Sequence, residues 1–116
     1  MRTALEIIHQ ERFEQINKHG YSLVWQMAHP EYYENDELVN AAKFCINPEE
    51  KQWPLLWDDS AAIKIKNKDR IGQLACAGAF LLSHEEMFGK STEISNMLRL
   101  CDLKIQERLD YPERFN

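Results

Sequence analysis

The chain has 116 residues, of which 44% are hydrophobic and 28% are charged, a balance typical of one globular domain. Its formal net charge of −5 argues against non-specific binding to nucleic acid, and the short basic run at residues 64–70 fits a solvated helix start better than a phosphate site. No stretch reaches the roughly 18 apolar residues that a membrane span requires, and the first residues lack the apolar segment of a secretory signal. We therefore predict one cytoplasmic domain over residues 1–116.

The three cysteines are Cys45, Cys76 and Cys101, an odd number at wide spacing, each within an apolar helical pattern. They form neither a disulfide framework nor a CxxC zinc motif. We interpret them as small buried hydrophobic residues in a reducing compartment.

The first predicted helix spans residues 3–18 and ends before Gly20. Its expected apolar face carries four residues at helical spacing: Leu5, Ile8, Phe13 and Ile16. Residues 21–29 then form an aromatic connector that contains Trp25 and Met27.

The second predicted helix spans residues 30–46, because Pro30 suits a first helical turn and Glu31 complements the helix dipole. Asn47 and Pro48 stop it. Residues 49–66 mix the aromatic anchors Trp53 and Trp57 with turn residues, which predicts a long packed loop with at most one short helical piece.

The third predicted helix spans residues 68–88, with Asn67 as its cap and Gly89 at its end. Residues 71–82 carry no charge and place apolar side chains all around the axis, so this helix should be the central one. One face aligns Gln73 with His84. A buried Gln73 must either hydrogen-bond a neighbouring helix or meet a polar ligand.

The fourth predicted helix begins after a Ser91 or Thr92 cap. It has a long apolar stripe of Ile94, Leu98, Cys101, Ile105 and Leu109, widened by Met97, Leu100 and Leu103. This is more apolar surface than a short domain covers alone, which favours a homodimer or larger homo-oligomer over a helix that simply folds back on the core. With no convincing period-2 strand, the pattern predicts a compact all-α domain of four helices.

Glu34 and Glu37 are three residues apart and therefore share one face of the second predicted helix. An inward-facing pair of glutamates needs a cation or a hydrogen-bond donor, and Mg²⁺ prefers such oxygen ligands. The alternative is that both carboxylates lie at the rim and pair with Lys or Arg.

Residues 33–41, Tyr-Glu-Asn-Asp-Glu-Leu-Val-Asn-Ala, resemble the Glu-Glu-x-x-Glu-Leu-x-x-Ala helix of the MazG-like all-α nucleotide pyrophosphohydrolases. In that family, acids of this helix and of a later Glu-x-x-Asp helix hold Mg²⁺ on a nucleoside triphosphate. Glu34 and Glu37 match the second and third acids, whereas Tyr33 replaces the first. At the later motif, Arg70 and Gln73 stand where the acids are expected, with Asp69 one residue away.

Residues 11–20 also resemble the Glu-Arg-x-x-Gln-x-x-x-x-Gly start of small phage and prophage proteins, and this likeness extends over roughly residues 6–88. The resemblance implies a mobile-element origin and leaves two functions. The first is a binding or interaction protein with a degenerate acidic site and a nucleotide ligand that Arg70, Gln73 and His84 contact. The second is a Mg²⁺-dependent nucleoside triphosphate pyrophosphohydrolase in which Glu34 and Glu37 bind the metal with help from Asp69. Two glutamates are few for such a site, which favours binding.

Overall fold

A computed structural model describes residues 2–115, and this part of the chain is helical with no strand. The helices are α1 (Ala4–Asn17), α2 (Leu23–Met27), α3 (Glu37–Ile46), α4 (Asp59–Lys66), α5 (Arg70–Phe88) and α6 (Thr92–Asp110), with short 3-10 helices η1 (Pro30–Tyr32) and η2 (Pro112–Phe115). The all-α prediction is confirmed. The count of four helices is wrong, because the connector contains α2 and the long loop ends in α4.

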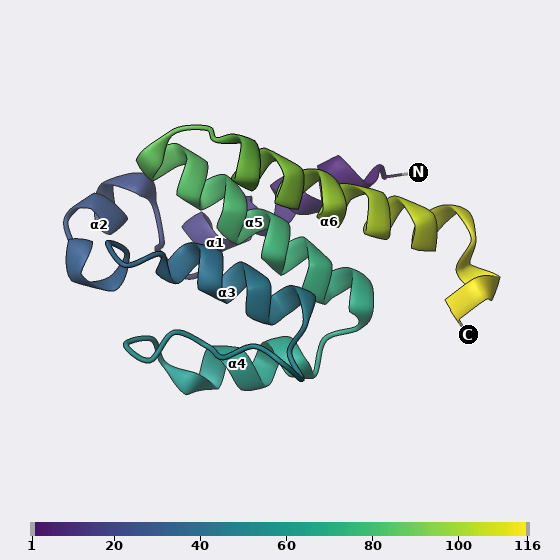
Figure 1. Ribbon diagram of the computed structural model, residues 1–116, viewed down its shortest axis with the longest axis horizontal. Helices are drawn as coiled ribbons and strands as arrows, with labels where there is room; N and C mark the ends of the chain where they lie inside the picture. Colours follow the sequence, from purple (N-terminus) through teal and green to yellow (C-terminus); the bar gives the residue numbers. More distant parts are fainter. Residues whose placement is uncertain (1, 116) are drawn as a thin grey trace.

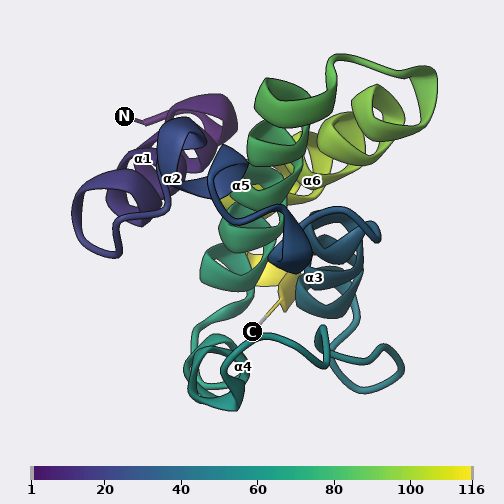
Figure 2. The ribbon, with the colours of Figure 1, turned by 90° about the vertical axis from the view of Figure 1, so that its left-hand side faces the viewer.

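Helix α5 lies at the centre of the molecule, as its lack of charge predicted. It contacts α1, α2, α3, α4 and α6, and Figure 2 shows the other helices arranged around it. In Figure 1, α6 and α3 lie on either side of α5, α1 lies behind it, and α4 lies beyond α3. Every residue from 74 to 79 is buried. This central position follows from an apolar surface that needs neighbours all round.

Gly78 sets the distance between α5 and α1. A methyl group added at Gly78 would lie only 2.8–2.9 Å from three carbons of the Ile8 side chain, which is fully buried. The absence of a side chain at Gly78 therefore allows α1 to approach α5 closely.

The buried face of α1 differs from the predicted one. Leu5 and Phe13 are exposed, whereas Ile8, Arg12 and Gln15 are buried. Arg12 is only 4% exposed because its guanidinium group pairs with Glu86 of α5, with Nη2 and Oε2 separated by 2.6 Å. Its Nη1 also donates to the Tyr21 carbonyl at 2.9 Å. Hydrophobic spacing does not encode a buried ion pair, so the predicted face is right for Ile8 and wrong for Leu5 and Phe13.

Capping side chains define five helix starts, including those of the three longest helices, α1, α5 and α6. Thr3, Asp69 and Ser91 each accept a hydrogen bond from a backbone N–H of the first turn of α1, α5 and α6. This confirms Ser91 and corrects the Asn67 cap, because Asn67 instead ends α4. Compared with an asparagine cap, Asp69 adds a negative charge that complements the helix dipole.

The second predicted helix begins seven residues later than expected. Pro30 opens only the single 3-10 turn η1, and a turn follows before α3 begins at Glu37. Asp36 adopts a left-handed conformation with φ of 62°, which interrupts any continuous helix. Glu34 and Glu37 therefore do not share a helix face.

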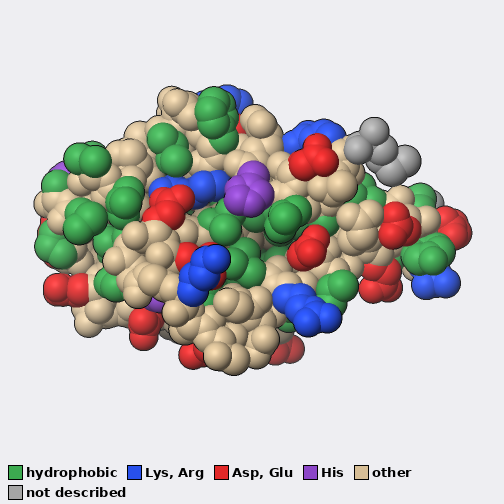
Figure 3. Space-filling view, turned by 90° about the horizontal axis from the view of Figure 1, so that it is seen from above, with side chains coloured by type: hydrophobic (Ala, Val, Ile, Leu, Met, Phe, Trp, Pro, Cys, Tyr) green, Lys and Arg blue, Asp and Glu red, His purple; other side chains and the backbone are tan. Residues whose placement is uncertain are grey.

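The apolar stripe of α6 is mostly covered within the chain. Ile94, Cys101 and Ile105 are buried, whereas Leu100 and Leu103 remain exposed. Figure 3 shows further hydrophobic side chains gathered at the end of the molecule where α2 and the α5–α6 connection lie. The homo-oligomer stays a prediction. Within residues 2–115, no helix has both the length and the apolar character needed to cross a membrane.

All three cysteines are free and buried, as predicted. Burial raises the pKa of each thiol, to about 11 for Cys101. The Cys76 thiol also donates to Glu11 Oε1 at 3.3 Å. These thiols stay protonated at neutral pH and act as packing groups.

The protein should become less stable in alkaline solution. The pKa of Cys101 is about 11 in the folded state against an ordinary 9.0, so the unfolded state releases this proton first. Stability is complete below pH 9 and falls as the pH rises to 11, because over this range the folded state holds more protons. Urea titrations from pH 8 to 11 measure the fall, and Cys101→Ala should reduce it in part, because burial also raises the pKa values of Cys45 and Cys76. A free energy of unfolding that stays constant or rises over this range would contradict the expectation.

Candidate functional site

The three acids predicted to hold magnesium lie in different environments. Glu34 is exposed on the turn before α3. Glu37 is buried, and its Oε1 accepts the backbone N–H of Asn35 at 2.7 Å. Asp69 accepts the N–H of Gly72 at 2.7 Å as the cap of α5. Two of the three carboxylates therefore already accept backbone hydrogen bonds.

Arg70 and Gln73 stand where acids were expected. Their side chains connect α5 to the ends of α3 and α4 by hydrogen bonds. The Arg70 guanidinium donates to the carbonyls of Cys45 and Ile46 at 3.2 and 2.5 Å, at the end of α3. The Gln73 amide donates to the Ile65 carbonyl at 3.3 Å, at the end of α4. The last carbonyls of a helix lack partners within it, so these donors satisfy groups that would otherwise be unpaired. Gln73 thus takes the hydrogen-bonding alternative offered by the sequence.

His84, the third predicted ligand-binding residue, lies near the end of α5. Its ring packs against Phe88, with 4.7 Å between ring centroids, and its Nδ1 is buried without a hydrogen-bond partner among the described residues. It is not among the residues that line either pocket described below.

The predicted acids do not fit a magnesium site in this arrangement. Within residues 2–115 no group of three or more His, Cys, Asp or Glu side chains is placed to hold a metal ion. Glu37 instead lines an open groove of about 550 Å³ together with Glu50, Lys43 and Lys51, so the groove carries balanced charges and not a cluster of acids. Magnesium stays a prediction from the sequence.

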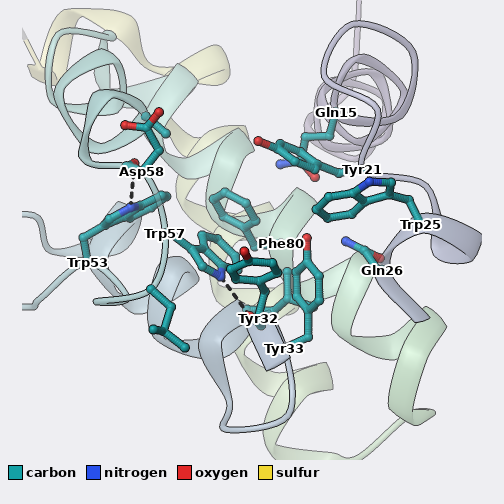
Figure 4. A pocket seen from close by; sticks show the side chains of 13 residues that line it. Gln15, Tyr21, Trp25, Gln26, Tyr32, Tyr33, Trp53, Trp57, Asp58 and Phe80 are labelled. Carbon is teal, nitrogen blue, oxygen red and sulfur yellow. Dashed lines mark hydrogen bonds between the residues drawn. The ribbon is translucent and has the colours of Figure 1, made fainter. Parts of the chain in front are cut away.

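A different feature is the strongest candidate site: a pocket of about 340 Å³ that we call the aromatic pocket (Figure 4). Every helix from α1 to α5 contributes to its wall. It is lined by seven aromatic residues, Tyr21, Trp25, Tyr32, Tyr33, Trp53, Trp57 and Phe80, together with Gln15, Gln26, Leu38, Leu56, Asp58 and Ala61. All three tryptophans of the chain are among them.

Two indole hydrogen bonds fix the loop side of the aromatic pocket. Trp57 Nε1 donates to the Tyr32 carbonyl at 2.8 Å, and Trp53 Nε1 donates to the Asp58 carbonyl at 3.2 Å (Figure 4). The Trp53 and Trp57 rings pack edge to face at 5.3 Å, and both contact Phe80 of α5. The loop before α4 is thereby held against the central helix.

The opposite wall is a run of packed rings. Trp25 of α2 lies 5.5 Å from Tyr21 and 6.2 Å from Tyr33, measured between ring centroids. His29 stacks on Trp25 at 4.2 Å, and its Nδ1 lies 2.7 Å from the Trp25 carbonyl. Because a carbonyl only accepts, Nδ1 carries the proton. Tyr33 continues the run to Trp57, 5.7 Å away, so the two walls are joined.

Two polar groups at this wall are buried, the Gln26 amide and the Tyr33 hydroxyl. Gln26 is 2% exposed, and its Nε2 donates to Ser83 Oγ at 2.7 Å, but its Oε1 has no hydrogen-bond partner among the described residues. A buried acceptor without a donor is uncommon and costly. Burial raises the pKa of the Tyr33 phenol to about 12, so this side chain is neutral at neutral pH.

The aromatic pocket was missed as a site because its residues come from three parts of the sequence that were read separately. The aromatic connector, the start of the second predicted helix and the Trp loop each carry two or more aromatic residues, at positions 21–25, 32–33 and 53–57. The signal was this enrichment in irregular segments, where large aromatic side chains need a common place to pack.

Comparison with known proteins adds no relative: the chain matches no family model, no curated protein and no solved structure. The resemblance to the MazG-like enzymes and to phage proteins therefore stays an expectation from sequence motifs.

Proposed function

We propose that this protein is a binding protein and that its ligand inserts a flat apolar group into the aromatic pocket. The observation that carries the proposal is the pocket itself: seven aromatic residues surround a space of about 340 Å³. This volume lies in the range of small-molecule sites, roughly 300–1,000 Å³, and such sites are mostly lined by apolar and aromatic side chains.

The pocket wall is organised before any ligand arrives. The two indole hydrogen bonds of Trp53 and Trp57 and the ring stack of His29 on Trp25 hold the rings without help from a ligand. A wall that is already ordered loses little entropy on binding, so more of the contact energy appears as affinity. The proposal keeps the binding function predicted from the sequence and places it at the aromatic rings.

Intrinsic fluorescence tests this function directly, because all three tryptophans line the pocket. A water-soluble ligand with one aromatic ring, 2-phenylethanol, should change the emission in a saturable manner. Ala61→Phe adds a ring at the half-buried wall of α4 and should weaken binding on the order of tenfold or more, which corresponds to at least about 1.4 kcal/mol.

Ile63→Phe is the matched control, since it adds the same ring to an exposed position of the same helix that does not line the pocket. Circular dichroism confirms that both variants fold. Equal affinity in the two variants, or a linear fluorescence response in the unmodified protein, would refute the pocket as the binding site.

The alternative function leads to a separate prediction. We expect little or no release of pyrophosphate from common nucleoside triphosphates with Mg²⁺, because within residues 2–115 no three acidic side chains are gathered to hold the metal and Glu34 lies on a turn before α3. A coupled pyrophosphate assay measures this. Robust turnover that Glu37→Gln abolishes would restore the pyrophosphohydrolase prediction.

A further inference from the structure

We infer that the ring that enters the aromatic pocket carries a hydroxyl group, so that the ligand is a neutral phenol held by tyrosine hydroxyls of the wall. This inference rests on the proposed function and specifies the polar part of the ligand. It follows from the direction of the tyrosine side chains and from the absence of a charged group that faces the rings among the described residues.

Three tyrosine hydroxyls point toward one space in front of Phe80. Figure 4 shows Tyr21 entering this space from one side and Tyr32 and Tyr33 from another, with the hydroxyl end of each side chain turned inward. Tyr33 is 5% exposed, whereas Tyr21 and Tyr32 are partly exposed. The pocket therefore presents a hydroxyl at its buried wall and two more at its rim.

The Tyr33 hydroxyl is placed to donate a hydrogen bond to a ligand. Burial is the main cause that raises the pKa of Tyr33 to about 12, so the phenol keeps its proton at neutral pH. A hydrogen bond with the Gln26 side chain opposes this rise, which means that the Gln26 amide donates to the phenol oxygen. The Gln26 oxygen faces away from the rings and has no partner within residues 2–115, so it does not take the Tyr33 proton. A ligand oxygen that accepts this proton would satisfy a buried donor.

Tyr21 brings a second hydroxyl close to that of Tyr33. After burial, the Tyr21 phenol is the next cause of the raised pKa of Tyr33, which requires the two groups to be near each other. A hydroxyl group both donates and accepts hydrogen bonds. A ligand hydroxyl between these side chains can accept from Tyr33 and donate to Tyr21, whereas a plain hydrocarbon ring can do neither.

The charges around the pocket favour a neutral ligand. Asp58 is the one charged side chain among the described residues that line it, but its carboxylate is exposed and accepts the Ser60 N–H at 2.9 Å as the cap of α4. Figure 4 shows this carboxylate turned away from the rings. Arg12 acts on Tyr33 electrostatically, but its guanidinium is paired with Glu86 at 2.6 Å. An ion that entered the pocket would lose water without gaining an oppositely charged partner, which is costly.

Two ligands that differ only in a ring hydroxyl test the inference: 2-phenylethanol and 2-(4-hydroxyphenyl)ethanol. Isothermal titration calorimetry should show binding of the hydroxylated ligand on the order of fivefold tighter, the gain expected from one net hydrogen bond. Tyr33→Phe removes the hydroxyl and keeps the ring, so it should reduce this preference to about twofold or less while 2-phenylethanol still binds. Tyr111→Phe is the matched control, because Tyr111 is exposed and does not line the pocket. Circular dichroism confirms that both variants fold.

Two further comparisons test the charge and the source of the phenol. The anion 4-hydroxyphenylacetate should bind more weakly than 2-(4-hydroxyphenyl)ethanol, and tighter binding of the anion would overturn a neutral ligand. N-acetyltyrosinamide carries the same phenol on a peptide unit. Tighter binding of this amide would support a tyrosine side chain of a partner protein as the source of the phenol, and weaker binding would support a small molecule.

The remaining outcomes separate this inference from the proposed function. Equal, saturable binding of 2-phenylethanol and 2-(4-hydroxyphenyl)ethanol would overturn the phenol and keep the pocket as a binding site. Saturable binding of neither ligand would overturn the proposed function itself. A preference for the hydroxylated ligand that persists unchanged in both Tyr33→Phe and Tyr21→Phe would show that these hydroxyls do not hold the ligand, and the inference would fail.

Discussion

Replacement of Trp53 with alanine should lower the free energy of unfolding by about 4 kcal/mol, the cost of truncating a buried tryptophan. Trp53 is 9% exposed and packs against Phe44, Trp57 and Phe80. Its indole also donates to the Asp58 carbonyl at 3.2 Å, so the same substitution releases the loop that leads into α4. Urea denaturation followed by circular dichroism measures the loss.

Leu55→Ala provides the control for this variant. Leu55 lies two residues away in the same loop but is 93% exposed, so its truncation should change stability by no more than about 0.5 kcal/mol. Similar losses for both variants would show that the loop is not anchored by Trp53. The comparison matters for function because the loop carries one wall of the aromatic pocket.

The second large effect is expected at the contact between α1 and α5. Gly78→Val should cost about 3 kcal/mol, the upper part of the usual range for overpacking, because even its first carbon would lie 2.8–2.9 Å from Ile8. Gly78→Ala should cost less, since alanine regains about 1 kcal/mol of helix propensity. Thermal unfolding should show the valine variant melting on the order of 10 °C lower.

A double mutant distinguishes a clash from a general intolerance of larger residues at this position. Ile8→Ala alone should destabilise the protein by about 2–5 kcal/mol because Ile8 is fully buried. Combined with Gly78→Val, it removes the atoms that clash. The double mutant should therefore lose less stability than the sum of the two single losses, by at least about 1 kcal/mol. Strict additivity would contradict the close approach of α1 and α5.

The helices that can be predicted from sequence are those with strong local signals. A charge-free stretch identified α5 as central. Gly89 marked the end of α5, and the Ser91 cap marked the start of α6. The errors have specific causes. Asp36 in a left-handed conformation delays α3, and the Arg12 to Glu86 ion pair turns a polar side of α1 inward. Both depend on contacts or backbone geometry that hydrophobic periodicity does not encode.

The candidate site was less predictable than the fold. The sequence drew attention to acids at positions 34, 37 and 69, whereas the structure gathers aromatic residues from three irregular segments, at positions 21–25, 32–33 and 53–57, around Phe80 of α5. A motif on one helix can be recognised from spacing. A pocket formed between α2, the Trp loop and α5 requires the tertiary arrangement, although the aromatic enrichment of irregular segments is a usable hint.

A crystal structure of the protein grown with 2-phenylethanol tests the central claim, binding in the aromatic pocket, most directly. We expect the phenyl ring in the aromatic pocket between Trp25 and Trp57. A phenyl ring bound in the groove beside Glu37, or an aromatic pocket that remains free of ligand at a concentration that saturates binding in solution, would contradict the account.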